Sequence, residues 1–457
     1  MLKLTFIADT HHYSKTLGTK GRQYELRSGS DQKCLAETGD IIDAAFEQIA
    51  DSDTDYVLIA GDVTNDGEMA SHLEFREKLY KLSKRKKIYL ITATHDWCND
   101  LNPRRYDGNE VYNDVPVMDA SNLYEFYRDF GINDAISVFK THIGTFSYSV
   151  KLGDSVRLLA LNDDKNEHNH AGFTPEHFEW IEDQIKEARE NGEMIIAMEH
   201  HLLIPHINPL ITGGSTCVAN REYVASRLAD AGIKYMFVGH SHIQNTADFK
   251  SAKGNVLTEI NIGSLVGYPA PMVRVDINDE NTISYRVEHL KSFSLDGKEI
   301  DAQKFLSDHA VALIDRVLNS PDEEEFAARL TALQLNGEKL KRAYNIIHPI
   351  MNLINDGTVF ELYKKFKYMG LAKGIDKELV NKFKNEKIID FVHQILLSAL
   401  DGSVVKHERN SDYYRLVMSF VQIPSKIFKN NTNLKRFIFT IDAILTGGKF
   451  NNQNETI

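Results

Sequence analysis

The chain has 457 residues, which is long for one hydrophobic core and predicts two domains. Hydrophobic residues make up 42% and charged residues 26%, as in a soluble globular protein. A formal net charge of −12 argues against a nucleic-acid-binding groove. Residues 301–457 carry 22 Lys+Arg and 19 Asp+Glu, so the acidic excess lies in residues 1–300, which also hold 14 of the 18 His. A first part rich in Asp and His suggests metal ligands.

The cysteines and the apolar runs indicate in which cellular compartment the protein lies. Three widely spaced cysteines, Cys34, Cys98 and Cys217, fit neither a disulfide framework nor a cysteine-based zinc module. The opening apolar run is too short for a signal peptide and ends at Asp9. No run approaches the roughly 20 residues needed to span a bilayer. We therefore expect a cytoplasmic protein with no membrane partner.

Residues 1–290 alternate short β-branched runs with longer amphipathic stretches, a pattern that predicts an α/β sheet. The expected strands are Leu4–Ala8, Tyr56–Ala60, Lys87–Ala93, Arg157–Leu161, Met194–Met198 and Lys234–Val238. The expected helices include Ile41–Ile49, Ser71–Leu82, Pro175–Ala188 and Glu222–Ala231. Three further runs predict antiparallel or edge strands: Val256–Ile262, Met272–Ile277 and Thr282–Val287.

After about residue 292 the strand signal stops and helical spacing takes over. Apolar residues recur at helical intervals at Leu340, Tyr344, Ile347, Met351 and Ile354. The segment Ser320-Pro321-Asp322-Glu323 predicts a helix start, with Pro321 at the first helical position. We therefore predict a first domain over residues 1–292 and an all-α domain over 300–457, whose last ten residues form a frayed tail.

Acidic residues and histidines follow five of the expected strands. In chain order they are Asp9-Thr10-His11-His12, Gly61-Asp62, Thr94-His95-Asp96, Glu199-His200-His201 and Gly239-His240-Ser241-His242. Ligands of an open α/β sheet bind beyond the carboxyl ends of its strands, so these residues should form one polar cluster. Carboxylates gathered there would repel one another unless a cation neutralised them. Any one of these residues alone is more often a helix cap or a satisfied loop residue, but five in order are hard to assign to chance.

In this order the segments resemble the motifs of the calcineurin-like metallophosphoesterases. The matching segments are Asp9-Thr10-His11, Gly61-Asp62-Val63-Thr64-Asn65-Asp66-Gly67, Ala93-Thr94-His95-Asp96, His200 and Gly239-His240-Ser241-His242. The resemblance covers residues 1 to about 290 and implies a layered α/β/β/α sandwich. Three further features look most like the bacterial branch related to cyclic-nucleotide phosphodiesterases: the Gly61–Gly67 segment, the His200-His201 pair, and Gly263-Ser264 with Tyr268-Pro269.

The resemblance also implies two divalent metal ions, such as Mn, Fe or Zn. Carried over by position, Asp9, His11 and His242 would hold the first ion, Asp62 would bridge, and His200 and His240 would hold the second. Thr94 stands where the family has an Asn ligand to the second ion. A Thr hydroxyl is a weaker ligand than an amide carbonyl, which puts that second site in question. His95 matches the family's catalytic His, which is not a metal ligand.

The implied function is hydrolysis of a phosphate ester by a bridging hydroxide at the two-metal centre. We expect a small-molecule diester or nucleotide-type substrate. A phosphomonoesterase or pyrophosphate hydrolase at the same metals is one alternative, and a non-catalytic scaffold is another. The helical domain could serve as a lid or as a surface for homo-oligomerisation.

Other residues near the expected site suggest weaker roles. His12, His201 and His206 are expected to be solvent-exposed loop histidines. Glu199 is expected to form a surface ion pair, although it could instead orient a histidine. The expected rim segments carry Arg22, Arg27, Arg104 and Arg105, which could grip phosphate but are individually more typical of solvated loop charges.

Overall fold

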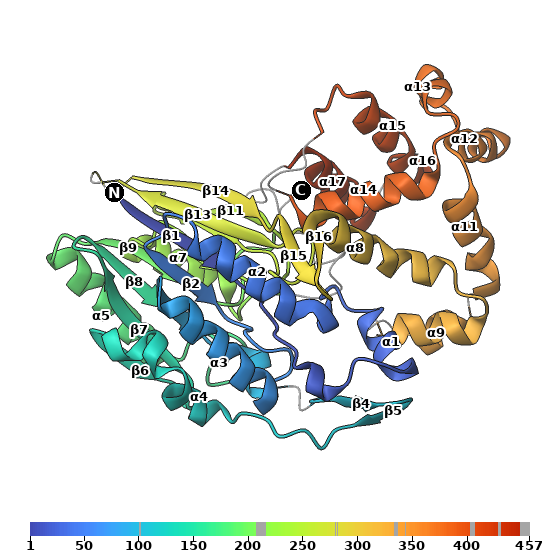
Figure 1. Cartoon of the computed structure of the whole chain (residues 1–457). Helices are drawn as coiled ribbons and strands as arrows, with labels where there is room; N and C mark the ends of the chain where they lie inside the picture. Colours follow the sequence, from blue (N-terminus) through green and yellow to red (C-terminus); the bar gives the residue numbers. More distant parts are fainter. Residues whose placement is uncertain are drawn as a thin grey trace.

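The computed structural model describes residues 1–99, 102–206, 216–278, 280, 282–332, 337–342, 344–402, 407–427 and 431–447. Its first part is built on two sheets that face each other (Figure 1). The expected frayed tail lies outside the described residues.

The first sheet has the strand order β14-β13-β1-β2-β3. Its strands are β1 (Leu2–Ile7), β2 (Tyr56–Ala60), β3 (Lys87–Ile91), β13 (Pro271–Ile277) and β14 (Ile283–His289). β1, β2 and β3 are parallel, with Leu4 opposite Tyr56 and Tyr56 opposite Lys87, whereas β13 runs antiparallel to β1. The three parallel strands therefore end at the same edge.

The second sheet has seven strands in the order β11-β12-β10-β9-β8-β7-β6. These are β6 (Ser137–Lys140), β7 (Phe146–Leu152), β8 (Val156–Ala160), β9 (Met194–Met198), β10 (Tyr235–Val238), β11 (Asn245–Lys250) and β12 (Val256–Asn261). β8, β9, β10 and β12 are parallel neighbours. The expected strands therefore do not form one sheet: β1, β2 and β3 belong to one sheet, and β8, β9 and β10 to the other.

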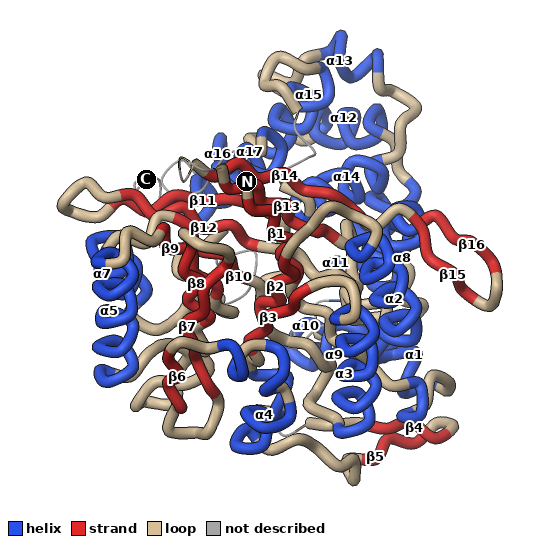
Figure 2. The backbone as a smooth tube through the Cα atoms, turned by 60° about the vertical axis from the view of Figure 1, so that its left-hand side comes forward, coloured by secondary structure: helices blue, strands red, loops and turns tan. Residues whose placement is uncertain are grey.

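Apolar side chains join the two sheets face to face. Phe6 of β1 stacks on Phe237 of β10, with ring centroids 3.7 Å apart, and both are fully buried. The outer faces are covered by α2 (Thr38–Ala50) and α3 (Met69–Ser83) on one side and by α5 (Pro175–Glu190) and α7 (Arg221–Ala231) on the other (Figure 2). This is the expected α/β/β/α layering.

Helices dominate the rest of the chain. They are α8 (Ala302–Leu318), α9 (Glu323–Ala332), α10 (Gly337–Lys341), α11 (Tyr344–Asp356), α12 (Val359–Tyr368), α13 (Lys377–Lys382), α14 (Ile388–Leu400), α15 (Asp412–Val421), α16 (Ile423–Ile427) and α17 (Thr432–Thr446). None of the helices that the structure describes is long and apolar enough to cross a membrane. We call residues 302–447 the helical region. Ala302 and Leu306 of α8 pack into the same core as β1, so the division at residues 292 and 300 stays a prediction.

Two local expectations were wrong. The strand signal does not stop at residue 292, because β15 (Ser292–Leu295) and β16 (Lys298–Asp301) form a hairpin. α9 begins at Glu323 rather than at Pro321, and the Asp322 carboxylate caps it by accepting from the Glu325 N–H at 2.8 Å. The Ser320 hydroxyl instead donates to the Val317 carbonyl at the end of α8, 2.8 Å away.

Smaller elements surround the site. They are η1 (Lys15–Leu17), α1 (Arg22–Ser28), η2 (Leu35–Glu37), η3 (Thr94–Trp97), β4 (Arg105–Asp107), β5 (Glu110–Tyr112), α4 (Ala120–Phe126), η4 (Arg128–Phe130) and η5 (Ile132–Asp134). Those between β1 and α2 matter most below, because they lie between the helical region and the loops that follow β1 and β2.

Candidate metal centre

The loops after β1, β2, β3, β9 and β10 meet at the edge shared by the two sheets. Backbone hydrogen bonds join them: the His11 N–H donates to the Asp62 carbonyl at 2.9 Å, and the Gly239 N–H donates to the His200 carbonyl at 3.0 Å. The His240 N–H crosses between the sheets to the Asp9 carboxylate, 3.0 Å from Oδ2. Strand ends from two sheets therefore deliver the expected residues to one place.

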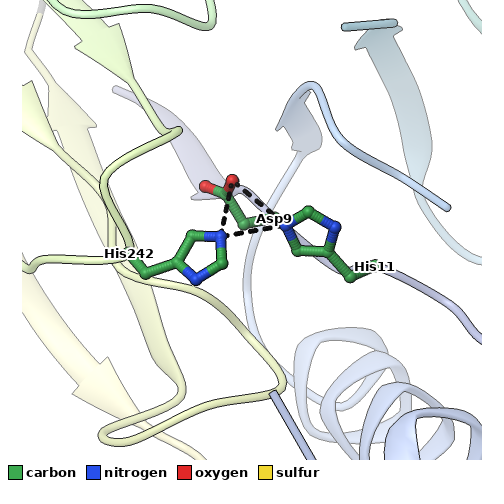
Figure 3. A group of neighbouring side chains, drawn as sticks. All are labelled: Asp9, His11 and His242. Atoms are coloured by element: carbon green, nitrogen blue, oxygen red, sulfur yellow. Dashed lines mark hydrogen bonds and ion pairs between the residues drawn. The ribbon is translucent and has the colours of Figure 1, made fainter. Parts of the chain in front are cut away.

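Asp9, His11 and His242 form a first group of converging side chains (Figure 3). The Nε2 atoms of the two histidines lie 2.9 Å apart. Asp9 Oδ1 lies 3.5 Å from His11 Nε2 and 3.4 Å from His242 Nε2. Three potential ligand atoms thus face one small volume.

A second group joins Asp62, His200 and His240, again with all potential ligand atoms within 4.8 Å of one another. His200 Nδ1 lies 2.9 Å from the Ala60 carbonyl, which can only accept, so Nδ1 carries the proton. In the neutral ring the lone pair therefore sits on Nε2, which lies 3.0 Å from Asp62 Oδ2. That lone pair could face a cation. With no cation bound, burial lowers the pKa of His200 but Asp62 raises it well above the usual value, so a proton occupies Nε2 and the contact with Asp62 is an ion pair.

Asp62 connects the two groups. Its Oδ2 lies 3.0 Å from His200 Nε2 in the second group and 3.8 Å from His11 Nε2 in the first. Its Oδ1 accepts from the backbone N–H of His95 at 3.1 Å, which fixes the carboxylate plane. Asp62 is therefore a carboxylate that approaches a histidine ring of each group.

The backbone of these loops is strained. Asp9, His11, Asp62, His240 and His242 all have positive φ, between 38° and 68°, where non-glycine residues are uncommon. Such strain persists only where the surrounding structure imposes it, and it gathers at functional sites. Gly61 has φ 84°, and a Cβ there would lie 2.7 Å from His200 Nδ1, so only glycine fits beside that imidazole.

The two groups suit divalent cations. Burial lowers the pKa of His11 to about 3 and that of His240 well below its usual value, so both imidazoles are neutral with a free lone pair. Burial opposes ionisation of Asp62, but the facing histidines, His200 foremost, hold its pKa well below the usual range. Carboxylates and neutral imidazoles are the ligand set of Mn, Fe and Zn. The residues present therefore fit two ions.

His95 lies on η3, beside Asp62 and His11. Its Nδ1 contacts the Asn65 carbonyl and lies 3.2 Å from Asp66 Oδ1. Burial lowers its pKa, but Asp62 and Asp66 together raise the pKa to about 9. The His95 ring contacts the His11 ring edge-on, with centroids 5.0 Å apart. His95 is therefore a neighbour of the first group rather than one of its members. Thr94 begins the same turn and is half-buried, and its part as a ligand stays a prediction.

Four expectations of exposed side chains were wrong. His12, His201 and His206 are all buried, each against one carboxylate: Glu74 at 2.8 Å, Asp163 at 3.1 Å and Glu259 at 2.9 Å. Glu199 is also fully buried, and neither carboxylate oxygen has a hydrogen-bond partner among the described residues. Burial and the charge of Asp163 raise its pKa well above the usual value, which favours the neutral acid. Glu199 directly follows the buried strand β9, and its N–H donates to the Phe237 carbonyl of β10, so solvent does not reach its side chain.

Three polar residues were missed at the end of β8. Asn162, Asp163 and Asp164 follow the expected strand Arg157–Leu161 and are all buried. Asp163 Oδ2 accepts from the His201 N–H at 2.8 Å, and Asp164 Oδ2 accepts from Trp97 Nε1 at 3.0 Å. The signal was available, because the rule that finds polar residues after strands applies to this run as well.

The four arginines of the rim segments have different surroundings. Arg22 pairs with Glu325, Arg105 with Asp114, and the Nε of Arg104 donates to Asn102. Arg27 is different: it lies 3.0 Å from Asp31 and 3.9 Å from Asp66. Asp66 in turn contacts His95, so Arg27 is the arginine of this set that the contacts connect to the site.

A family model named calcineurin-like phosphoesterase matches residues 2–244, more than half of the chain. The chain therefore belongs to the calcineurin-like phosphoesterases. It is a phosphoric ester hydrolase of a family that uses divalent metal ions, and its reaction class is metal-dependent hydrolysis of a phosphate ester. No curated protein matches the sequence.

Several solved structures resemble the chain at low identity. A dimetal phosphatase from Danio rerio is 10% identical, with a TM-score of 0.43 over 66% of this chain and 98% of that one. A purple acid phosphatase from yellow lupin seeds is 12% identical, with a TM-score of 0.43 over 66% and 52%. A 5′-nucleotidase precursor from Thermus thermophilus is 14% identical, with a TM-score of 0.37 over 70% and 59%.

Proposed function

We propose that the protein hydrolyses a small phosphodiester or nucleotide-type substrate at two divalent ions. The observation that carries this proposal is the position of Asp62, whose Oδ2 reaches both His11 and His200. In this proposal Asp9, His11 and His242 hold one ion, His200 and His240 hold the other, and Asp62 bridges them. Thr94 completes the second set or leaves a place for water.

The chain's own residues have separate tasks in this proposal. The bound ions would supply positive charge to the phosphoryl oxygens and a water of lowered pKa. Asp62 and the five other ligands would determine how far apart the two ions lie. His95 stands outside both groups and is the proton donor for the leaving oxygen, because Asp66 and the Asn65 carbonyl engage its Nδ1 and leave Nε2 to face the substrate.

The preference for a diester rests on sequence features that gather at this site. The Gly61–Gly67 segment contains Asp62 and Asp66, and the His200-His201 pair contains a candidate ligand and its buried neighbour. Ser264 of the third feature donates to the Asp9 carbonyl at 2.8 Å. These features support a place in the bacterial branch related to cyclic-nucleotide phosphodiesterases.

Turnover with defined substrates tests this proposal. We expect the protein with added Mn²⁺ to hydrolyse a bis-aryl phosphate diester and a cyclic nucleotide faster than an aryl phosphate monoester or pyrophosphate. The Asp62→Asn variant, assayed in parallel, shows how much turnover comes from this centre. Faster hydrolysis of the monoester or of pyrophosphate would replace the diester assignment with one of those activities.

A further inference from the structure

A buried charge network lies beside the candidate centre, in the segment between β1 and α2. Lys33 and Arg27 both approach Asp31 Oδ2, at 3.6 Å and 3.0 Å. Asp31 and Lys33 are buried, and Arg27 is mostly covered. Two cations and two carboxylates, those of Asp31 and Asp66, balance one another there. Charges this deeply covered need their partners, so removing one leaves another uncompensated.

This network reaches His95. Arg27 Nη2 lies 3.9 Å from Asp66 Oδ2, and the other oxygen, Oδ1, lies 3.2 Å from His95 Nδ1. Asp66 is thus held between a guanidinium and an imidazole. Asp66 Oδ2 also accepts from Asn65 Nδ2 at 2.9 Å, so each carboxylate oxygen has its own partners and a turn of the group would weaken its contact with His95. Arg27 therefore acts together with Asn65 on the placement of the carboxylate that contacts His95.

The helical region holds the same segment from outside. His309 of α8 donates from Nε2 to the Asp31 backbone carbonyl at 2.8 Å. Arg316 of α8 lies so close to Gly29 that a Cβ there would be 2.9 Å from its Nη1. On the neighbouring α9, Glu325 pairs with Arg22 of α1. Figure 1 shows α9 beside α1.

We propose that the helical region is a positioning part of the active site: through α8 and α9 it fixes the segment 22–34, and Asp31 and Arg27 pass that placement to Asp66 and His95. The inference rests on the proposed function for its catalytic consequence. The helical region supplies no reacting group in this account. Asp31, Arg27 and His309 are positioning residues, because their contacts described above are with one another and with Asp66.

The test compares His309→Ala with His309→Gln in the full chain. Glutamine places an N–H donor near the position of the histidine Nε2, so it should keep the bond to Asp31. We expect His309→Ala to lower kcat with an alkyl leaving group by at least about tenfold, with metal content unchanged. Turnover of an aryl ester should fall less, because an aryl oxide leaves without protonation. His309→Gln should restore most of the loss.

His393→Ala is the matched control. Like His309, His393 makes a hydrogen bond that involves α8: its Nε2, on α14, lies 2.6 Å from Asp315 Oδ1. This contact joins two helices of the helical region rather than α8 and segment 22–34. We expect wild-type turnover from this variant. Equal losses in His393→Ala and His309→Ala, or equal losses for aryl and alkyl esters, would overturn the proposal and leave only a general effect on folding.

A second readout does not depend on turnover. In ¹⁵N-histidine NMR spectra, the His95 signals are those that disappear in His95→Gln. We expect Asp31→Asn and His309→Ala to shift these signals, and His393→Ala to leave them in place. Unshifted His95 signals in a folded Asp31→Asn or His309→Ala protein would refute the coupling. If the signals shift but no phosphate ester is hydrolysed by the wild type, the proposed function fails while the coupling stands.

Discussion

Asp62 and His200 face each other in the buried edge between the sheets, with Oδ2 3.0 Å from Nε2. The Ala60 carbonyl accepts from the other nitrogen of His200, so Nε2 faces Asp62 either as the N–H of an imidazolium or as a lone pair available to a cation. Asp62 raises the pKa of His200 well above the usual value despite burial, so without a bound cation this contact is an ion pair. A divalent cation between the two atoms would take the place of that proton. This pair, more than any single motif, links the sequence pattern to metal chemistry.

His95→Gln should separate chemistry from metal binding. We expect this variant to keep its metal content and to lose roughly 10²–10⁴-fold in turnover of an alkyl phosphate ester, the usual contribution of a general acid. The loss should shrink for aryl esters, whose leaving group needs no proton. Steady-state kinetics over a series of leaving groups checks this. A uniform loss across the series would assign His95 another task.

Thr94→Asn should strengthen the second metal site. Asparagine adds a carbonyl oxygen with longer reach at a position where threonine offers only a neutral hydroxyl. We expect two sites of unequal affinity in the wild type and closer affinities in the variant, measured by isothermal titration with Mn²⁺. Two equal sites in the wild type, unaltered by the substitution, would mean that Thr94 only packs the turn.

Gly61→Ala should disturb the centre even though alanine is small. The left-handed φ of 84° disfavours any side chain, and the Cβ would press on His200 Nδ1 and on the Ala93 methyl group. We expect loss of metal from the site shared by Asp62 and His200, measured by metal analysis of the folded protein. Gly192→Ala is the control, because its φ is also positive but nothing lies within 4 Å of the added Cβ. Equal metal content in the two variants would count against this packing argument.

His177 should make the fold sensitive to acid. Its ring is buried and stacks on Phe139 with centroids 4.3 Å apart, and its Nε2 has no hydrogen-bond partner among the described residues. Burial lowers its pKa to about 3, so between that value and the usual 6.5 the unfolded chain binds the extra proton. The contribution of His177 to the free energy of unfolding is therefore complete above pH 6.5 and falls as the pH drops toward 3.

Replacing this ring by phenylalanine should remove that dependence. Between pH 7 and pH 5 we expect His177→Phe to lose about 2 kcal/mol less unfolding free energy than the wild type. Urea unfolding at both pH values measures this. The exposed His168→Phe should behave as the wild type. A parallel decline in wild type and His177→Phe would show that other groups control the acid response.

Local sequence patterns predicted the elements of the first part well. β2 and β9 have the predicted bounds, and α5 begins at Pro175 as expected, because Thr174 caps it. The division of strands between two sheets did not follow from these patterns. It depends on which faces pack together, such as Phe6 on Phe237, and the family resemblance rather than the periodicity supplied it.

The sequence also indicated which residues would meet, but not their surroundings. Asp9, His11, Asp62, His200, His240 and His242 lie together as expected, because strand ends are readable in the sequence. The burial of His201 against Asp163 was not predicted, since it depends on how the β8 and β9 ends approach. The role of segment 22–34 was missed for the same reason, because its partners lie on α8 and α9, far away in the chain.

The metal content of four proteins tests the central claim most directly: wild type, Asp62→Ala, His242→Ala and His240→Ala, each folded and dialysed against Mn²⁺. Two ions that share Asp62 predict two equivalents for the wild type and a loss at both sites in Asp62→Ala. The His242 and His240 variants should each lose one site. Two tightly bound ions in folded Asp62→Ala would contradict a centre bridged by this carboxylate.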